Sequence, residues 1–262
     1  MTVCRARLSK LRLQELPRDE RRLFLALGHA VNEVSALREL LFWSSDFSPD
    51  NEALTQGRIT FALLFVRLLA GKTKEAYELI RKRFLNSKTL SQLYLSILSP
   101  KGQEALSTLK RLFGGSNLLS SVRNELAFHY SPDAIDAALD GLSDELDLYI
   151  EGEKQANTLY YCSEVLAGRA LFKSLGALDD PKAFNRLMEE TTSAADAIHN
   201  FAEAFIEAFL ARHREELWDG YATPVELGEL ENFMSVKLNW FTDPVDLLKL
   251  EGRKQSIGNE SA

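Results

Sequence analysis

Three side chains near the middle of this chain could together cleave a phosphodiester. Arg123 is followed directly by Asn124 and, after four further residues, by His129. A histidine titrates near neutral pH and can move protons, and an arginine stays cationic and stabilises charge that develops on a phosphate. Asn124 could hydrogen-bond the phosphate or hold His129. The set predicts RNA cleavage that needs no metal.

A helix expected over residues 117–130 must position these groups. The turn Gly114-Gly115-Ser116 precedes it, and Ser131-Pro132 ends it. His129 then lies in the last turn, where the helix dipole favours the protonated imidazole of a general acid. At about 100° per residue, Arg123 and His129 are separated by roughly 240° around a straight helix. A distorted helix or a second subunit is therefore needed to bring them together.

The motif Arg123-Asn124-x4-His129, near the end of a helix in an all-α chain, resembles the HEPN family, whose name denotes higher eukaryotes and prokaryotes nucleotide-binding domains. The resemblance implies a helical bundle that forms homodimers, in which the motifs of two protomers meet to form a composite ribonuclease site. It implies attack of an RNA 2′-hydroxyl on the adjacent phosphate, a 2′,3′-cyclic phosphate product and no metal or cofactor. Arg123, Asn124 and His129 are then the catalytic residues of a toxin or defence protein.

Two other functions stay open at this point. Arg123 could pair with an acidic residue such as Asp133 or Asp136, while His129 packs among aromatic side chains. The chain would then be a non-enzymatic interaction or adaptor protein, for example an antitoxin-like partner. A metalloenzyme ranks third.

The sequence Gly71-Lys72-Thr73 matches only the end of a phosphate-binding P-loop. The glycine that should stand five residues earlier is replaced by Val66, and the preceding segment is helical rather than strand-like. A break in a helix at Gly71 is expected instead.

The histidines other than His129 give weak signals. His29 with Glu33, and Asp196 with His199, have spacings that place both members on one helix face, but a carboxylate-bridged metal site needs two Glu-x-x-His motifs. We expect solvated polar pairs and no metal site, and we expect His213 on an exposed charged face.

Charge is unevenly distributed along the chain. The net charge is −7, but residues 1–130 carry 20 Lys and Arg against 12 Asp and Glu, and residues 131–262 carry 11 against 26. A basic half joined to an acidic half indicates either a face that binds a polyanion such as RNA or two halves that attract each other.

The chain is expected in the cytoplasm, without contact to a membrane. Cys4 and Cys162 form no metal-binding or disulfide pattern, and the N-terminus lacks the apolar segment of a secretory signal. The most apolar window, residues 59–70, contains Arg67 and is shorter than the roughly 20 residues that span a bilayer. It is expected to be a core helix.

Proline positions and helical periodicity predict an all-α helical bundle with additional C-terminal helices. All seven prolines can start a helix, and six follow a Ser, Thr or Asp that can cap one, among them Ser99-Pro100 and the capping box that begins at Thr223-Pro224. We expect a HEPN-like bundle over residues 1–150, helices packed on it over 151–250, and a disordered tail over 251–262. Almost no strand is expected.

Overall fold

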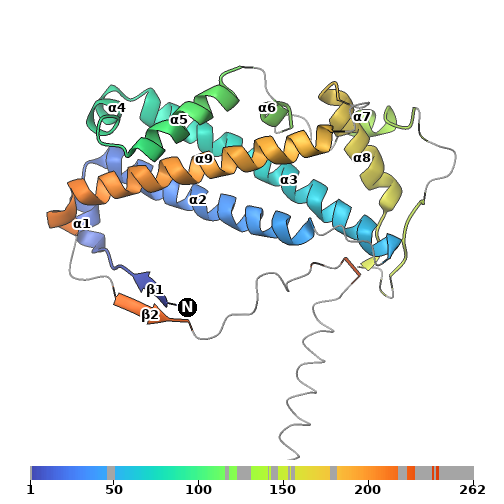
Figure 1. Cartoon of the computed structure of the whole chain (residues 1–262), viewed down its shortest axis with the longest axis horizontal. Helices are drawn as coiled ribbons and strands as arrows, with labels where there is room; N and C mark the ends of the chain where they lie inside the picture. The colour runs from blue at the N-terminus through green and yellow to red at the C-terminus, as the bar shows by residue number, and fades with distance from the viewer. Residues whose placement is uncertain are drawn as a thin grey trace, which may run out of the picture.

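In the computed structural model of the chain, long helices lie side by side as a bundle (Figure 1). The structure describes residues 2–45, 51–115, 118–122, 131–140, 142, 147–152, 154, 157–177, 182–217, 223–227, 238, 240 and 241. The prediction of an all-α helical fold is confirmed.

Three long helices and the shorter α5 form the core. They are α2 (Arg18–Ser44), α3 (Glu52–Ile80), α5 (Pro100–Phe113) and α9 (Ala183–Arg212). Leu23, Leu27, Val34 and Leu41 form a buried apolar stripe on α2, because every third or fourth residue of a helix returns to the same face. In Figure 1, α9 crosses the whole bundle and contacts α2, α3 and α5. It shares one hydrophobic core with them.

Shorter helices close the two ends of the bundle. They are α1 (Lys10–Glu15), α4 (Lys88–Tyr94), α6 (Leu118–Val122), α7 (Pro132–Asp136), α8 (Tyr161–Ser174) and α10 (Arg214–Leu217). The segment before α8 contains a β-bridge, in which Ile150 and Leu159 exchange backbone hydrogen bonds of 2.8 and 2.9 Å. The expected tail over 251–262 lies outside the described residues.

Several proline signals mark helix starts as expected. Pro100 is the first residue of α5, and the Ser99 hydroxyl accepts a hydrogen bond of 3.3 Å from the backbone N–H of Gly102. Pro132 begins α7, and Pro17 stands one residue before α2. The signals at Ser48-Pro49, Asp180-Pro181 and Asp243-Pro244 fall outside the described part of the chain.

The helix expected at Thr223-Pro224 is wrong, because this segment is a strand. β2 (Thr223–Glu226) pairs antiparallel with β1 (Thr2–Arg5), and Pro224 stands opposite Cys4. A capping box favours only the first turn of a helix, whereas a complementary strand satisfies backbone groups along the whole segment. Proline is tolerated because, among the described residues, the sheet has two strands, and each has one edge that pairs with no other described strand.

The helix break expected at Gly71 is also wrong, because α3 runs without interruption to Ile80. Gly71 and Thr73 are buried, and the Thr73 hydroxyl donates to the Ala70 carbonyl at 2.9 Å. Tertiary burial thus outweighs the low helix propensity of one glycine. With the π-helical turn η1 (Arg81–Leu85), this helix is long and apolar enough by composition to cross a membrane, but here it packs against α2, α6 and α9.

Glu78 forms ion pairs with three basic side chains near the point where α3 ends and η1 begins. Its carboxylate lies 2.6 Å from the Arg81 guanidinium, 3.2 Å from Lys74 Nζ and 3.6 Å from Lys82 Nζ. The hydrogen bond from Arg81 is the largest cause that lowers the pKa of Glu78, from 4.5 to about 2, and Lys74 adds to it.

A buried polar network joins the first turn of α2 to the ends of α4 and α9. The Tyr94 hydroxyl donates to the Glu20 carboxylate, and His213 Nε2 lies 2.8 Å from Glu20 Oε2. Arg212 Nε lies 3.7 Å from the same oxygen. The expectation of an exposed His213 is wrong, since only 6% of its surface is accessible. Burial, then the bond to Glu20, raises the pKa of Tyr94 far above 10, so that its hydroxyl remains a donor.

Removing the Tyr94 hydroxyl should destabilise the fold. Tyr94→Phe leaves the buried Glu20 carboxylate with one donor fewer, and we expect the free energy of unfolding to fall by about 1–3 kcal/mol. The matched control is Tyr77→Phe, because the Tyr77 ring is also buried but its hydroxyl makes no hydrogen bond with any described residue. Urea unfolding would measure both, and equal stability of the two variants would contradict this role of Tyr94.

Glu78 should contribute stability that is lost in acid. Because folding lowers its pKa, the contribution is complete above about pH 4.5 and disappears as the pH falls toward about 2. At pH 7 we expect Glu78→Gln to cost about 1–2 kcal/mol, and this difference from the wild type should shrink through that interval. Glu104→Gln, which removes an exposed carboxylate of α5, should change stability by less than about 0.5 kcal/mol at any pH. A pH-independent cost of Glu78→Gln would refute the assignment.

Candidate active site

The predicted catalytic residues lie in the stretch that joins α6 to α7. Arg123, Asn124 and His129 all fall within residues 123–130, outside the described residues, as does any contact of Arg123 with Asp133 or Asp136. The elements on both sides of the motif are described. They fix where the chain enters and leaves this stretch.

The short helix α6, which precedes the motif in the chain, is firmly packed. In α6, Leu119 and Val122 are fully buried against α3 and α9, since their spacing of three residues places both on one helix face. Phe113 ends α5, and Gly114 follows as its C-cap, as the glycine pair predicts. The residue immediately before Arg123 is therefore anchored in the core.

The chain leaves the motif toward α8. The guanidinium of Arg169 donates to the backbone carbonyls of Ala138 and Asp140 at 3.3 Å each, and Lys173 Nζ donates to the carbonyl of Ala137 at 3.1 Å. Cations at the C-terminal end of a helix satisfy its unpaired carbonyls and complement its dipole. These contacts fix α7 and the turn after it on α8.

A cavity of about 620 Å³ lies directly beside α6. It is lined by Arg111 and Leu112 of α5, Leu118 and Ser121 of α6, Ser174 and Leu175 at the end of α8, and Arg186 and Glu190 of α9. Ser121 stands two residues before Arg123, so the cavity adjoins the point where the motif begins.

The side chains around this cavity suit an anionic ligand. Arg111 and Arg186 come from different helices, and both are exposed. A guanidinium keeps its charge at every physiological pH and matches the oxygens of a phosphate with paired N–H donors. Glu190 is the one carboxylate among the lining residues, so these residues carry a net positive charge.

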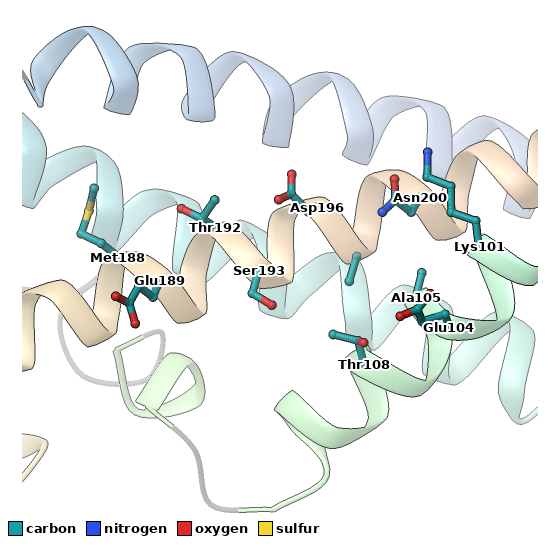
Figure 2. Close-up of a pocket in the computed structure, with 11 residues that line it drawn as sticks. Lys101, Glu104, Ala105, Thr108, Met188, Glu189, Thr192, Ser193, Asp196 and Asn200 are labelled. Carbon is teal, nitrogen blue, oxygen red and sulfur yellow. The ribbon is translucent and has the colours of Figure 1, made fainter.

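A second cavity, of about 630 Å³, lies between α5 and α9 (Figure 2). Two of its charged groups are already paired with other side chains, and the first, Asp196, binds Arg38 at 2.5 Å. Lys101 Nζ lies 3.0 Å from Glu203, whose pKa its hydrogen bond lowers. No histidine lines this cavity. Its lining contains three carboxylates and one lysine, so it suits an anionic ligand less well than the cavity beside α6 does.

The weaker sequence signals prove to be structural. Lys72, from the partial P-loop match, lies within α3 and binds Glu33 at 2.6 Å. His29 and Glu33 form a solvent-exposed pair at 3.8 Å, as expected. Among the residues that the structure describes, no three His, Cys, Asp or Glu side chains are arranged to hold a metal ion.

Sequence analysis missed Arg111 and Arg186 as candidate binding residues. They are 75 positions apart, and each looks like an ordinary surface arginine of a helix. The packing of α5 beside α9 brings them to one cavity. Only their position near the predicted motif gives them a functional interpretation.

Comparison with known proteins adds no relative. No protein-family model, no curated protein and no solved structure matches this chain.

Proposed function

We propose that the chain is a HEPN-like, metal-independent endoribonuclease with a role in toxin or defence biology. What supports the proposal is the sequence motif Arg123-Asn124-x4-His129, which follows α6 in the chain, together with the cavity beside α6 that is lined by two arginines. The helical bundle is the architecture that the resemblance implies. The motif would supply the proton-transfer group, and the cavity would hold the RNA backbone.

The reaction is an internal transfer within the RNA. His129 takes part in proton transfer as the 2′-hydroxyl oxygen attacks the adjacent phosphorus and the bond to the 5′-oxygen of the next nucleotide breaks. The 5′-oxygen leaves with a proton, and the other fragment ends in a 2′,3′-cyclic phosphate. Arg123 stabilises the negative charge on the phosphate in the transition state, and Asn124 binds a phosphate oxygen or orients His129.

His129→Ala should abolish most RNA cleavage without unfolding the chain. A general acid or base contributes typically 10²–10⁴-fold, so we expect a rate loss of about that size. Mixed RNA would be incubated in excess EDTA, and the new ends would be tested for cyclic phosphate. Arg123→Ala should reduce both cleavage and RNA binding.

The matched control is His199→Ala, because His199 is an exposed histidine on α9. It should cleave as the wild type does, and both variants should unfold at the wild-type temperature. Cleavage by His129→Ala and Arg123→Ala at the wild-type rate would refute the proposal. So would a folded, dimeric wild type that cuts no RNA.

A composite site in a homodimer predicts complementation between two inactive variants. If each site takes Arg123 from one protomer and His129 from the other, a mixed dimer of Arg123→Ala and His129→Ala retains one intact site. Random exchange of subunits should then restore about a quarter of the wild-type activity. Proven subunit exchange without any recovery would contradict this arrangement.

A non-enzymatic adaptor is the second candidate. A third cavity, of about 600 Å³, lies between α2 and α9, shares Met188, Thr192 and Asp196 with the cavity in Figure 2, and is bordered by the half-exposed Phe42. Such grooves along one helix suit a protein partner. A stable complex with another protein that is unaffected by His129→Ala, from a chain that cuts no RNA, would favour this function.

A further inference from the structure

We infer that a second RNA contact lies at the end of the bundle away from α7 and α8. It is a phosphate-binding hollow formed by α2 and η1. It is lined by Asp19 and Arg22 of α2, Lys82 and Arg83 of η1, and Ser87 after it, and it encloses about 90 Å³. We call these five residues the basic hollow. The inference rests on the proposed function, since the RNA held here would be the substrate cut at the motif.

Two buried anchors hold the walls of the hollow in place. Glu20, fixed by Tyr94 and His213, orients the first turn of α2, so that Asp19 and Arg22 face outward. On the other wall, Phe84 of η1 is fully buried and packs edge-on against Phe201 and Phe205 of α9. The cations thus stand on rigid backbone.

The π-helical turn determines which side chains reach the hollow. The backbone N–H of Asn86 donates to the carbonyl of Arg81 at 3.0 Å, a bond that spans five residues. This wider turn keeps Phe84 in the core while Lys82 and Arg83 both stay exposed at the hollow. Such turns are rare and are often found at functional sites.

The positive charge of the hollow is only partly neutralised. Glu78 binds Arg81, Lys74 and Lys82 on the neighbouring surface. Within the described part of the chain, Arg22 and Arg83 make no hydrogen bond or ion pair, and Asp19 is the one acidic lining residue. Two guanidinium groups therefore remain available to an anion from solution.

The chemistry of the lining favours the phosphate backbone of a nucleic acid. Arginine, lysine and serine are among the side chains that contact the backbone phosphates of nucleic acids. No apolar side chain lines the hollow, so it offers nothing that would insert into a bilayer. The hollow would hold the strand without reading its sequence.

RNA must be long to use both sites. In Figure 1, α2 begins beside α1, at the end of the bundle away from α7 and α8. A helix of 27 residues, such as α2, is about 40 Å long. A strand of about twenty nucleotides at about 3.4 Å each exceeds that length, whereas one of about six nucleotides does not.

The test compares Arg22→Gln/Arg83→Gln with a control variant, Lys101→Gln/Lys110→Gln, which removes the same charge from exposed positions of α5. The probe is a labelled, 2′-O-methylated oligouridylate of about twenty nucleotides, which cannot be cut by its own 2′-oxygen. Binding would be measured between about 50 and 200 mM salt. Loss of two phosphate contacts should weaken binding about tenfold or more, and it should reduce the slope of log K against log salt by about 1.4.

Cleavage assays separate this inference from the proposed function. The Arg22/Arg83 variant should have a raised KM with unchanged kcat on RNA of about twenty nucleotides, and unaltered kinetics on RNA of about six. Probe binding that depends on Arg22 and Arg83 in a chain that cuts no RNA would support the hollow and refute only the ribonuclease.

Equal probe binding by the Arg22/Arg83 and control variants would overturn the inference and leave the ribonuclease standing. So would a wild type that ignores the probe but binds vesicles of phosphatidylserine through Arg22 and Arg83. The hollow would then belong to a membrane surface.

Discussion

The row of phenylalanines along α9 is the contact on which the bundle depends. Phe201, Phe205 and Phe209 are spaced four residues apart and are fully buried. Their rings meet side chains from three other segments: Phe209 stacks on Phe24 of α2 at 4.4 Å, Phe205 meets Tyr94 of α4 at 4.9 Å, and Phe201 meets Phe84 of η1 at 5.2 Å. Aromatic side chains bury large apolar surfaces, so this row joins helices that are distant in sequence. Both proposed RNA contacts are held by elements that pack on α9.

Much of the helical architecture could be predicted because it follows from local chemistry. A proline after a capping residue marks the start of α5, a glycine pair marks its end, and a period of three or four residues marks the buried face of α2. The failures involve partners that are distant in sequence. Thr223-Pro224 becomes a strand only because Thr2–Arg5 lies beside it. His213 is buried only because Glu20, 193 residues earlier, meets it.

The residues of the candidate sites also divide into those that could be recognised from the sequence and those that could not. Arg123, Asn124 and His129 could be recognised because they stand within seven residues, and the chemistry of their side chains is sufficient to suggest a reaction. Arg22 and Arg83 could not be paired from the sequence, since each looks like a solvated charge until α2 and η1 come together. The π-helical turn that exposes Lys82 and Arg83 has no sequence signature of its own. A short motif can be recognised from the sequence, but a binding surface assembled from separate helices can be recognised only from the tertiary structure.

The effect of the charge asymmetry on RNA binding depends on where the individual charges lie. Part of the attraction between the two halves of the chain is used at the surface of the bundle, where Arg38 binds Asp196 and Lys101 binds Glu203. A net charge of −7 would by itself repel RNA, but charges more than about 8 Å apart are largely screened at physiological salt. An RNA strand near the surface therefore responds to the charges of the nearest side chains and not to the net charge of the chain. Arginines left without carboxylate partners, as in the basic hollow, can bind phosphate on a protein that is acidic overall.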